Sequence, residues 1–225
     1  MDVAVLETLE NARADRLAVA VVTDIASGAQ EVIAQRYAEE HVLAEALETG
    51  FRFDKSGVVS TDKAEFFIHV HNPALRLVII GAVHIAQAIV PMAKAAGYDI
   101  TVIDPRGAFA TEDRFPGVKL HADWPDEILP AMALDARTGF LALTHDPKVD
   151  DPALVAALQS ECFYIGALGS RRTQAARIER LKQAGVEPSR ICGPVGLDIG
   201  ARGAPEIAIS IMAEMTRALR LGLDT

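Results

Sequence analysis

The stretch from Leu77 to Arg106 constrains the fold of this chain more than any other. It opens with an apolar run, Leu77–Ile80, which is typical of a parallel strand buried on both faces. An apolar stripe at helical spacing follows, and Gly97 marks its C-terminal stop. The β-branched run Ile100–Ile103 completes a strand–helix–strand unit of about 30 residues. This unit predicts a parallel sheet with right-handed crossovers.

The turn after the first strand occupies the place of the dinucleotide-binding fingerprint. Gly81 would make the tight turn, and Asp104, at the end of the second strand, would accept a hydrogen bond from a ribose hydroxyl. The middle glycine of the fingerprint is replaced by Val83, whose isopropyl group obstructs a pyrophosphate. The sequence therefore predicts the fold, with NAD(P) binding weakened by Val83. A tight turn that binds no dinucleotide is an equal alternative.

The alternation of strands and helices continues after this unit. Further strands are expected at residues 118–121, 140–144 and 163–165, and a helix at 126–132. Pro152 is expected in the first turn of another helix, with Asp150 and Asp151 as candidate caps. The fold class is thus α/β, a Rossmann-like doubly wound parallel sheet in which Leu77–Ile80 is central.

Residues 1–74 are predicted to form a smaller N-terminal α+β domain, followed by a Rossmann-like domain over residues 75–225. Asn72-Pro73 breaks the pattern and marks the boundary. Within the smaller domain we expect a helix near Val5, and the other expected elements are a strand at 17–22, a helix at 36–47 and hairpin strands at 58–59 and 66–70.

The composition limits the classes of partner. The net charge of −9 argues against a general binder of nucleic acid or of anionic membranes. The start of the chain lacks a basic segment, and polar residues interrupt the apolar stretch 77–97, so neither a signal peptide nor a membrane span is expected. The two cysteines, Cys162 and Cys192, form neither a disulfide framework nor a zinc-like pair, and no metal site is predicted. We expect a soluble cytoplasmic protein that forms a homo-oligomer.

Glycine-bearing loops at the carboxyl ends of the strands should converge on one crevice. In the loop after residues 163–165, Gly169 precedes Ser170, which can cap a helix whose first turn holds Arg171 and Arg172. Basic residues there oppose the helix dipole by about 0.3–1 kcal/mol each. A bound anion would relieve this conflict, whereas the alternative is a pair of solvated arginines.

Other residues could line the same crevice. Asp198, which follows Gly196 in a glycine-rich loop, could bind amino or hydroxyl groups of a ligand or could cap the last helix. His84 and His145 follow strands that should be neighbours, so their imidazoles could meet there or could be structural. Cys192 could be a soft ligand, although cysteine is commonly a small buried hydrophobe.

Several segments together resemble the XdhC/CoxI family, over about residues 75–221. They are GAVHIAQAIVPMAKAAGYDITVIDPR, FATEDRFP at 109–116, THD at 144–146, GALGSRR at 166–172 and GPVGLDIG at 193–200. Members of that family assist the maturation of molybdenum hydroxylases such as xanthine dehydrogenase and carbon monoxide dehydrogenase. The resemblance implies a C-terminal Rossmann domain, binding of the molybdenum cofactor (molybdopterin), and its delivery in sulfurated form to the apoenzyme. A cysteine desulfurase would be a further partner. The chain departs from the family at Val83, where a glycine is usual, and in having no cysteine before Cys162.

We therefore expect a cofactor-binding chaperone that is not itself catalytic. Its cofactor-binding residues are predicted to be Gly81, His84, Asp104, His145, Gly169, Ser170, Arg171, Arg172, Gly196 and Asp198. An NAD(P)-dependent oxidoreductase that uses Gly81 and Asp104 is the alternative, and Val83 and the lack of a Tyr-Lys pair count against it. A scaffold that only docks a partner enzyme is the third hypothesis.

Overall fold

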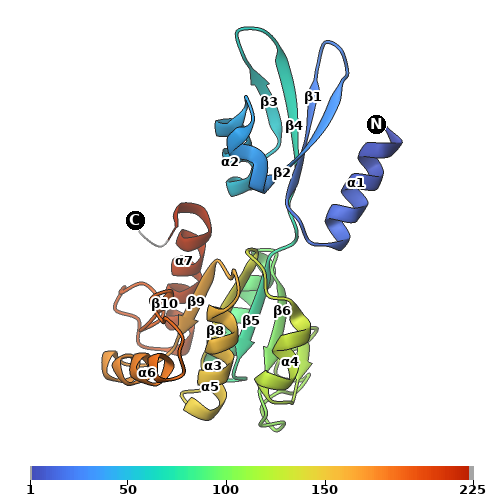
Figure 1. Cartoon of the computed structure of the whole chain (residues 1–225). Coiled ribbons are helices and arrows are strands. Elements are labelled where there is room, and N and C mark those ends of the chain that lie inside the picture. Colours follow the sequence, from blue (N-terminus) through green and yellow to red (C-terminus); the bar gives the residue numbers. More distant parts are fainter. Residues whose placement is uncertain (1, 223–225) are drawn as a thin grey trace. The chain divides into compact units, whose positions relative to one another are not determined.

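A computed structural model describes residues 2–222 of the chain. The chain divides into two compact units, one ending at Pro73 and the other beginning at Ala74 (Figure 1). The N-terminal unit is an α+β unit, and the C-terminal unit is built on a larger parallel sheet.

The N-terminal unit contains an antiparallel four-stranded sheet in the order β2-β1-β4-β3. Ile68 and Val70 of β4 lie on the face that packs against α2, around Leu47 and Phe51. The elements of this unit are α1 (Val3–Ala14), β1 (Val19–Asp24), β2 (Gln30–Ala34), the 3-10 helix η1 (Gln35–Glu40), α2 (Ala44–Phe53), β3 (Gly57–Ser60) and β4 (Glu65–His71).

The prediction of one helix over residues 36–47 is wrong. The backbone N–H of Leu43 donates to Nδ1 of His41 at 3.1 Å, a local bond that replaces helical pairing between η1 and α2. Gly50 lies inside α2, at a position where a Cβ would come within 2.9 Å of Val70 Cγ2. The glycine therefore permits close packing of α2 on β4.

The C-terminal unit contains a six-stranded parallel sheet in the order β10-β9-β8-β5-β6-β7. This confirms the predicted fold class, with β5 flanked by β6 and β8. The strands are β5 (Arg76–Ile80), β6 (Asp99–Ile103), β7 (Lys119–His121), β8 (Thr138–Ala142), β9 (Tyr164–Ala167) and β10 (Ile191–Cys192). The helices are α3 (His84–Ala95), α4 (Pro125–Met132), α5 (Pro147–Leu158), α6 (Arg171–Gln183) and α7 (Ala204–Leu221).

Strand β5 shows why this sheet is buried on both faces. Leu77 and Ile79 belong to one apolar core together with residues of α3 and α7. Val78 and Ile80 point to the opposite face and belong to a second core with residues of α4, α5 and α6. The helices thus form a layer on each side of the sheet (Figure 1).

The chain reverses its direction across the sheet between β5 and β8. From β5 it proceeds to β6 and β7, and it then returns to β8 on the other side of β5. Doubly wound sheets bind ligands in the crevice outside the carboxyl ends of the strands at such a point. A ligand crevice is therefore expected among the loops after β5, β6, β8, β9 and β10.

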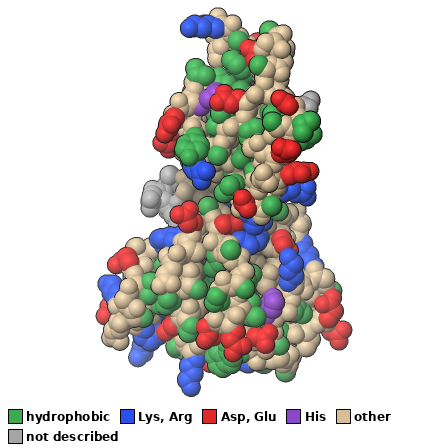
Figure 2. Space-filling model, turned by 45° about the vertical axis from the view of Figure 1, so that its right-hand side comes forward, with side chains coloured by type: hydrophobic (Ala, Val, Ile, Leu, Met, Phe, Trp, Pro, Cys, Tyr) green, Lys and Arg blue, Asp and Glu red, His purple; other side chains and the backbone are tan. Residues whose placement is uncertain are grey.

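Within residues 2–222, no helix has the length and apolar character needed to cross a membrane. On the face drawn in Figure 2, acidic side chains are spread over the larger unit among basic and apolar ones. This mixture agrees with the net charge of −9.

Candidate functional site

The turn after β5 lies directly against the end of β8. Gly81 has a φ of +108°, and a Cβ at this position would lie 2.8 Å from Cγ2 of Thr144. Only glycine fits this turn without strain. Gly81 therefore lies beside the segment Thr144–His145, at the point where the topology reverses.

Asp104 follows β6 but is fully buried and does not face the crevice. Its carboxylate accepts hydrogen bonds from the backbone N–H of Ala82 at 2.8 Å and from the backbone and guanidinium of Arg106 at 2.8–2.9 Å. Burial alone would raise the pKa of Asp104, but the hydrogen bonds from Arg106 and Ala82 and the charge of Arg106 outweigh it and lower the pKa. The carboxylate thus fixes the turn between β5 and α3, and a ribose hydroxyl would have to compete with these donors.

The two predicted histidines are both exposed at this edge of the sheet. His84 is the first residue of α3, and His145 lies between β8 and α5 with a φ of +64°. Within residues 2–222, neither imidazole makes a hydrogen bond or ion pair. Both side chains are therefore available to a ligand, although no contact joins them to each other.

The N-terminus of α6 has the predicted capping geometry. Gly169 has a φ of +149°, and Ser170 accepts a hydrogen bond from the backbone N–H of Thr173 at 3.1 Å. Arg171 and Arg172 occupy the first turn, are exposed, and form no ion pair with the described residues. The first turn of α6 therefore carries two exposed arginines at the end of the helix where N–H groups lack helical partners.

A pocket of about 360 Å³ adjoins this helix end. It brings Arg171 together with Gly196 and Asp198, and the loop from Pro194 to Ala201 supplies most of its lining. Asp198 is exposed and does not cap the last helix, since the carboxylate of Glu206 accepts the backbone N–H groups of Arg202 and Gly203. Asp198 is therefore free to meet a ligand in the pocket.

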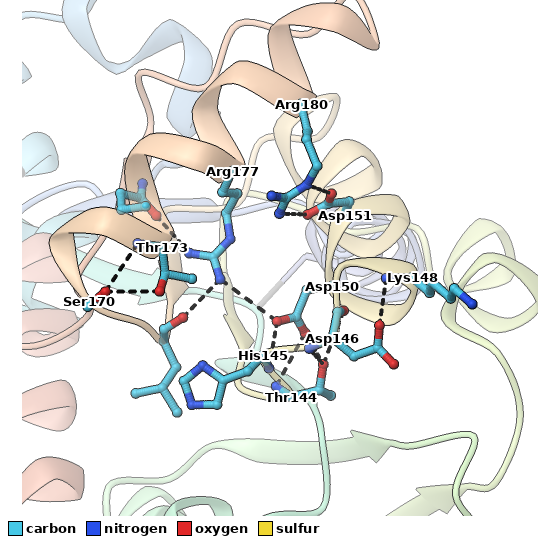
Figure 3. Close-up of polar contacts among 12 residues, drawn as sticks. Thr144, His145, Asp146, Lys148, Asp150, Asp151, Ser170, Thr173, Arg177 and Arg180 are labelled. Carbon is cyan, nitrogen blue, oxygen red and sulfur yellow. Dashed lines mark hydrogen bonds and ion pairs between the residues drawn. The ribbon is translucent and has the colours of Figure 1, made fainter.

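Asp150 and Asp151 do not cap a helix, so that prediction is wrong. Helix α5 begins at Pro147, and its cap is Asp146, which accepts from the backbone N–H of Lys148 at 2.9 Å. Asp150 is instead buried one turn inside the helix, where it accepts the backbone N–H groups of Thr144 and His145 (Figure 3). The helix was predicted to start too late, because Pro147 and not Pro152 lies in its first turn, and Pro152 lies inside the helix.

Sequence reasoning also missed the buried groups that support these loops. Arg177, in α6, is only 2% exposed, and its guanidinium donates to the backbone oxygen of Leu168 at 2.9 Å. Glu214, in α7, accepts from the hydroxyl of Tyr164 and from the backbone N–H of Gly196 at 2.8 Å. An arginine or glutamate on an otherwise apolar helix face is the only sequence signal that could have indicated them.

Cys192 is half-buried at the end of β10. Burial, followed by the nearby charge of Glu214, raises the pKa of its thiol to about 12. A thiol with this pKa is almost entirely protonated at neutral pH, which makes it a poor nucleophile and metal ligand. Within residues 2–222, no cluster of three or more His, Cys, Asp or Glu side chains could hold a metal ion.

The fold and the loops at its switch point define the chain as a Rossmann-like, doubly wound α/β protein with a small N-terminal α+β unit. Residues 77–215 match the XdhC Rossmann domain, and the chain belongs to the XdhC family.

Curated relatives share this part of the chain. The chain is 34% identical over 150 residues to the molybdenum cofactor insertion chaperone PaoD of Escherichia coli, covering 64% of this chain and 40% of that protein. It is 32% identical over 150 residues to a probable xanthine dehydrogenase subunit from Bacillus subtilis, covering 66% and 44%. The uncharacterized protein YqeB of Escherichia coli is 35% identical over 154 residues, with 66% and 28% covered. The chain spans less than half the length of these relatives.

The fold is also found in a solved structure. A crystal structure of a xanthine dehydrogenase from Bacillus halodurans superposes with a TM-score of 0.69, covering 96% of this chain and 67% of that one. The sequence identity is 24%, so the likeness shows a shared fold.

Proposed function

We propose that this chain is a maturation factor that binds the molybdenum cofactor (molybdopterin) and assists its insertion into a molybdenum hydroxylase of the xanthine dehydrogenase or carbon monoxide dehydrogenase type. The observation that carries the proposal is the position of Arg171 and Asp198 on one pocket at the N-terminus of α6. The name of the relative PaoD, an insertion chaperone for this cofactor, supports it.

The residues that line the pocket, together with Arg172 beside it in the first turn of α6, fit the chemistry of this cofactor. Molybdopterin carries a phosphate at one end and a pyrimidine ring with N–H donors at the other. A helix N-terminus with Arg171 and Arg172 suits the phosphate, because N–H groups and guanidinium groups both stabilise an anion. The carboxylate of Asp198 accepts hydrogen bonds and suits the ring. A pocket of about 360 Å³ is within the usual range for small ligands.

The energetics of α6 also favour an anion. Arginines in the first turn of a helix cost about 0.3–1 kcal/mol each through the helix dipole. Within residues 2–222 no acidic side chain pairs with Arg171 or Arg172 to offset this cost. A phosphate bound at this helix end would interact favourably with both the helix dipole and the two arginines, and would thus offset their mutual repulsion.

The proposed role is binding and delivery without turnover. When bound, the cofactor carries the molybdenum chemistry that the client hydroxylase uses. Arg171, Arg172 and Asp198 hold it, while His84 and His145 border the crevice. Exposure of these side chains at the carboxyl edge leaves the cofactor accessible to an apoenzyme that docks there.

The test is a titration of the purified protein with molybdopterin, in parallel with NAD⁺. The variant Arg171→Ala/Arg172→Ala loses two charge-assisted hydrogen bonds of about 1.5–3 kcal/mol each, so its affinity should fall by at least about tenfold. Lys182→Ala, which removes an exposed charge from the other end of α6, is the control and should bind as the original does.

Two outcomes would overturn the proposal. Unchanged molybdopterin affinity in a folded double variant would place the cofactor elsewhere. Tight NAD⁺ binding by the unmodified chain, in spite of Val83 and the engaged carboxylate of Asp104, would favour the oxidoreductase instead.

A further inference from the structure

Arg177 occupies the centre of a buried polar network between α5, α6 and the loops of the site (Figure 3). It lies further along α6 than the arginines of the first turn and points inward. Its guanidinium contacts groups that belong to different segments of the chain. These contacts distinguish it from an arginine that merely pairs with one neighbour.

The first connection leads to the loop after β8. Nη2 of Arg177 lies 3.9 Å from Oδ2 of Asp150, and both side chains are 2% exposed. Asp150 in turn accepts from the hydroxyl of Thr144 at 2.7 Å, from its backbone N–H at 3.3 Å, and from the backbone N–H of His145 at 3.1 Å. The carboxylate therefore holds His145 in its left-handed backbone conformation.

The second connection leads to the loop after β9. Nη2 of Arg177 also donates to the backbone oxygen of Leu168, at 2.9 Å. Leu168 immediately precedes Gly169 and the cap residue Ser170. The same guanidinium group therefore fixes the approach of the chain to the N-terminus of α6.

The third connection leads to the loop after β10. Nη1 of Arg177 donates to Oε1 of Gln174 at 2.7 Å. The Gln174 amide packs so closely on Gly193 that a Cβ there would lie 2.3 Å from its Oε1. Gly193 begins the loop that carries Gly196 and Asp198. By holding the Gln174 amide against Gly193, Arg177 therefore helps to fix the position of the loop that lines the pocket.

This network is costly, which argues that stability is not its purpose. Burial raises the pKa of Asp150 and lowers that of Arg177, so each charged form is disfavoured by desolvation. Nε of Arg177 is buried and has no hydrogen-bond partner among the described residues. Apolar residues of similar volume commonly replace buried ion pairs without loss of stability.

We propose that Arg177 is a positioning residue that fixes the loops after β8, β9 and β10 relative to one another, so that His145, the N-terminus of α6 and Asp198 face one ligand together. The benefit for binding rests on the proposed function, since an ordered pocket avoids the entropy cost of ordering loops when the cofactor binds. The coupling of the loops does not depend on which ligand binds.

The chain contains a matched control for this proposal. Arg180 lies one turn further along α6 and pairs with Asp151 of α5, with Nη2 and Oδ1 3.0 Å apart (Figure 3). Like Arg177, it therefore links α6 to α5. Its guanidinium donates to the carboxylate of Asp151 and does not reach the loops.

The experiment compares Arg177→Met with Arg180→Met by amide hydrogen exchange without ligand and by titration with molybdopterin. In Arg177→Met, peptides covering residues 143–146, 168–171 and 192–196 should exchange at least about tenfold faster, while β5 is unchanged. Arg180→Met should leave these peptides near their original rates. Molybdopterin affinity should fall at least about tenfold in Arg177→Met alone.

Two further variants keep the test decisive if Arg177→Met does not fold. Arg177→Lys keeps a positive charge near Asp150 but has a single ammonium in place of the several N–H donors of the guanidinium. The bonds to Leu168 and Gln174 should therefore be lost, and only the loops after β9 and β10 should loosen. Asp150→Asn should loosen only residues 143–146. Original exchange rates in all three loops of a folded Arg177→Met, or the same acceleration in Arg180→Met, would overturn the proposal. If the unmodified chain does not bind molybdopterin, the proposed function fails, but the exchange data still decide the coupling.

Discussion

Oδ2 of Asp104, at the end of β6, lies 2.8 Å from the backbone nitrogen of Ala82 at the end of β5 and accepts its N–H. This carboxylate, which the sequence predicted to bind a ribose hydroxyl, thus has a structural role in holding the turn after β5. The same arrangement recurs at two other loops, where Asp150 accepts the N–H groups of Thr144 and His145 and Glu214 accepts that of Gly196. Buried carboxylates hold the loops, which leaves the exposed side chains free for a ligand.

We expect Asp104→Asn to destabilise the C-terminal unit by roughly 2–3 kcal/mol, because an amide places an N–H donor among donors. Asp99→Asn, on the same strand, is the control. Its ion pair with Lys119 is largely exposed and should contribute less than about 1 kcal/mol. Urea unfolding of both variants measures the difference, and equal losses would contradict the role of Asp104.

The same carboxylate should make stability depend on acid pH. The folded-state pKa of Asp104 lies below its ordinary value of 3.8, so its stabilisation is complete above that value and is lost as the pH falls through the folded pKa. The gap in unfolding free energy between the original chain and Asp104→Asn should therefore be constant near neutral pH and narrow below about pH 4. A gap that does not narrow in acid would show that Asp104 is not ionised in the folded chain.

We expect Gly196→Ala to be more damaging than Gly200→Ala. Both glycines have positive φ, +96° and +76°, so both variants incur backbone strain of about 1–2 kcal/mol. Only at Gly196 would the new Cβ also clash, at a position close to Oγ of Ser210 on α7, which adds about 1–3 kcal/mol. Because both variants carry the backbone strain, the difference between their melting temperatures measures the effect of the clash. Similar melting temperatures would mean that α7 shifts to accommodate the new Cβ without loss of stability.

Neither cysteine should react with alkylating reagents in the folded protein at pH 8. Burial raises the pKa of both thiols, to about 12 for Cys192. Its thiolate fraction at pH 8 is then roughly 10⁻⁴, against about a quarter for an ordinary cysteine of pKa 8.5. Mass spectrometry after iodoacetamide treatment should detect modified cysteine only when the protein has first been unfolded in guanidinium chloride. Rapid labelling of Cys192 in the native state would restore it as a candidate soft ligand.

The order of strands and helices in the C-terminal unit could be predicted because each signal is local. Leu77–Ile80 lacks alternation since both its faces are covered, and Ser170 precedes a helix that its own side chain caps. The prediction failed where a distant or competing contact decides the conformation. His41 interrupts the expected helix at 36–47 by accepting from Leu43, and Asp146 replaces Asp150 as the cap of α5.

The sequence by itself determined the fold class, the family resemblance and the chemistry of the exposed residues Arg171, Arg172 and Asp198, because these follow from local periodicity and from residue types in characteristic motifs. Only the tertiary structure decided which charged residues are exposed at the carboxyl edge of the sheet and which are buried and hold the loops. In the sequence, Asp104 resembles a ribose ligand and Asp150 a helix cap, while Arg177 and Glu214 look like any other charged residues. Their roles depend on burial and on backbone N–H or C=O groups brought close by the fold, in most cases from segments far away in the chain.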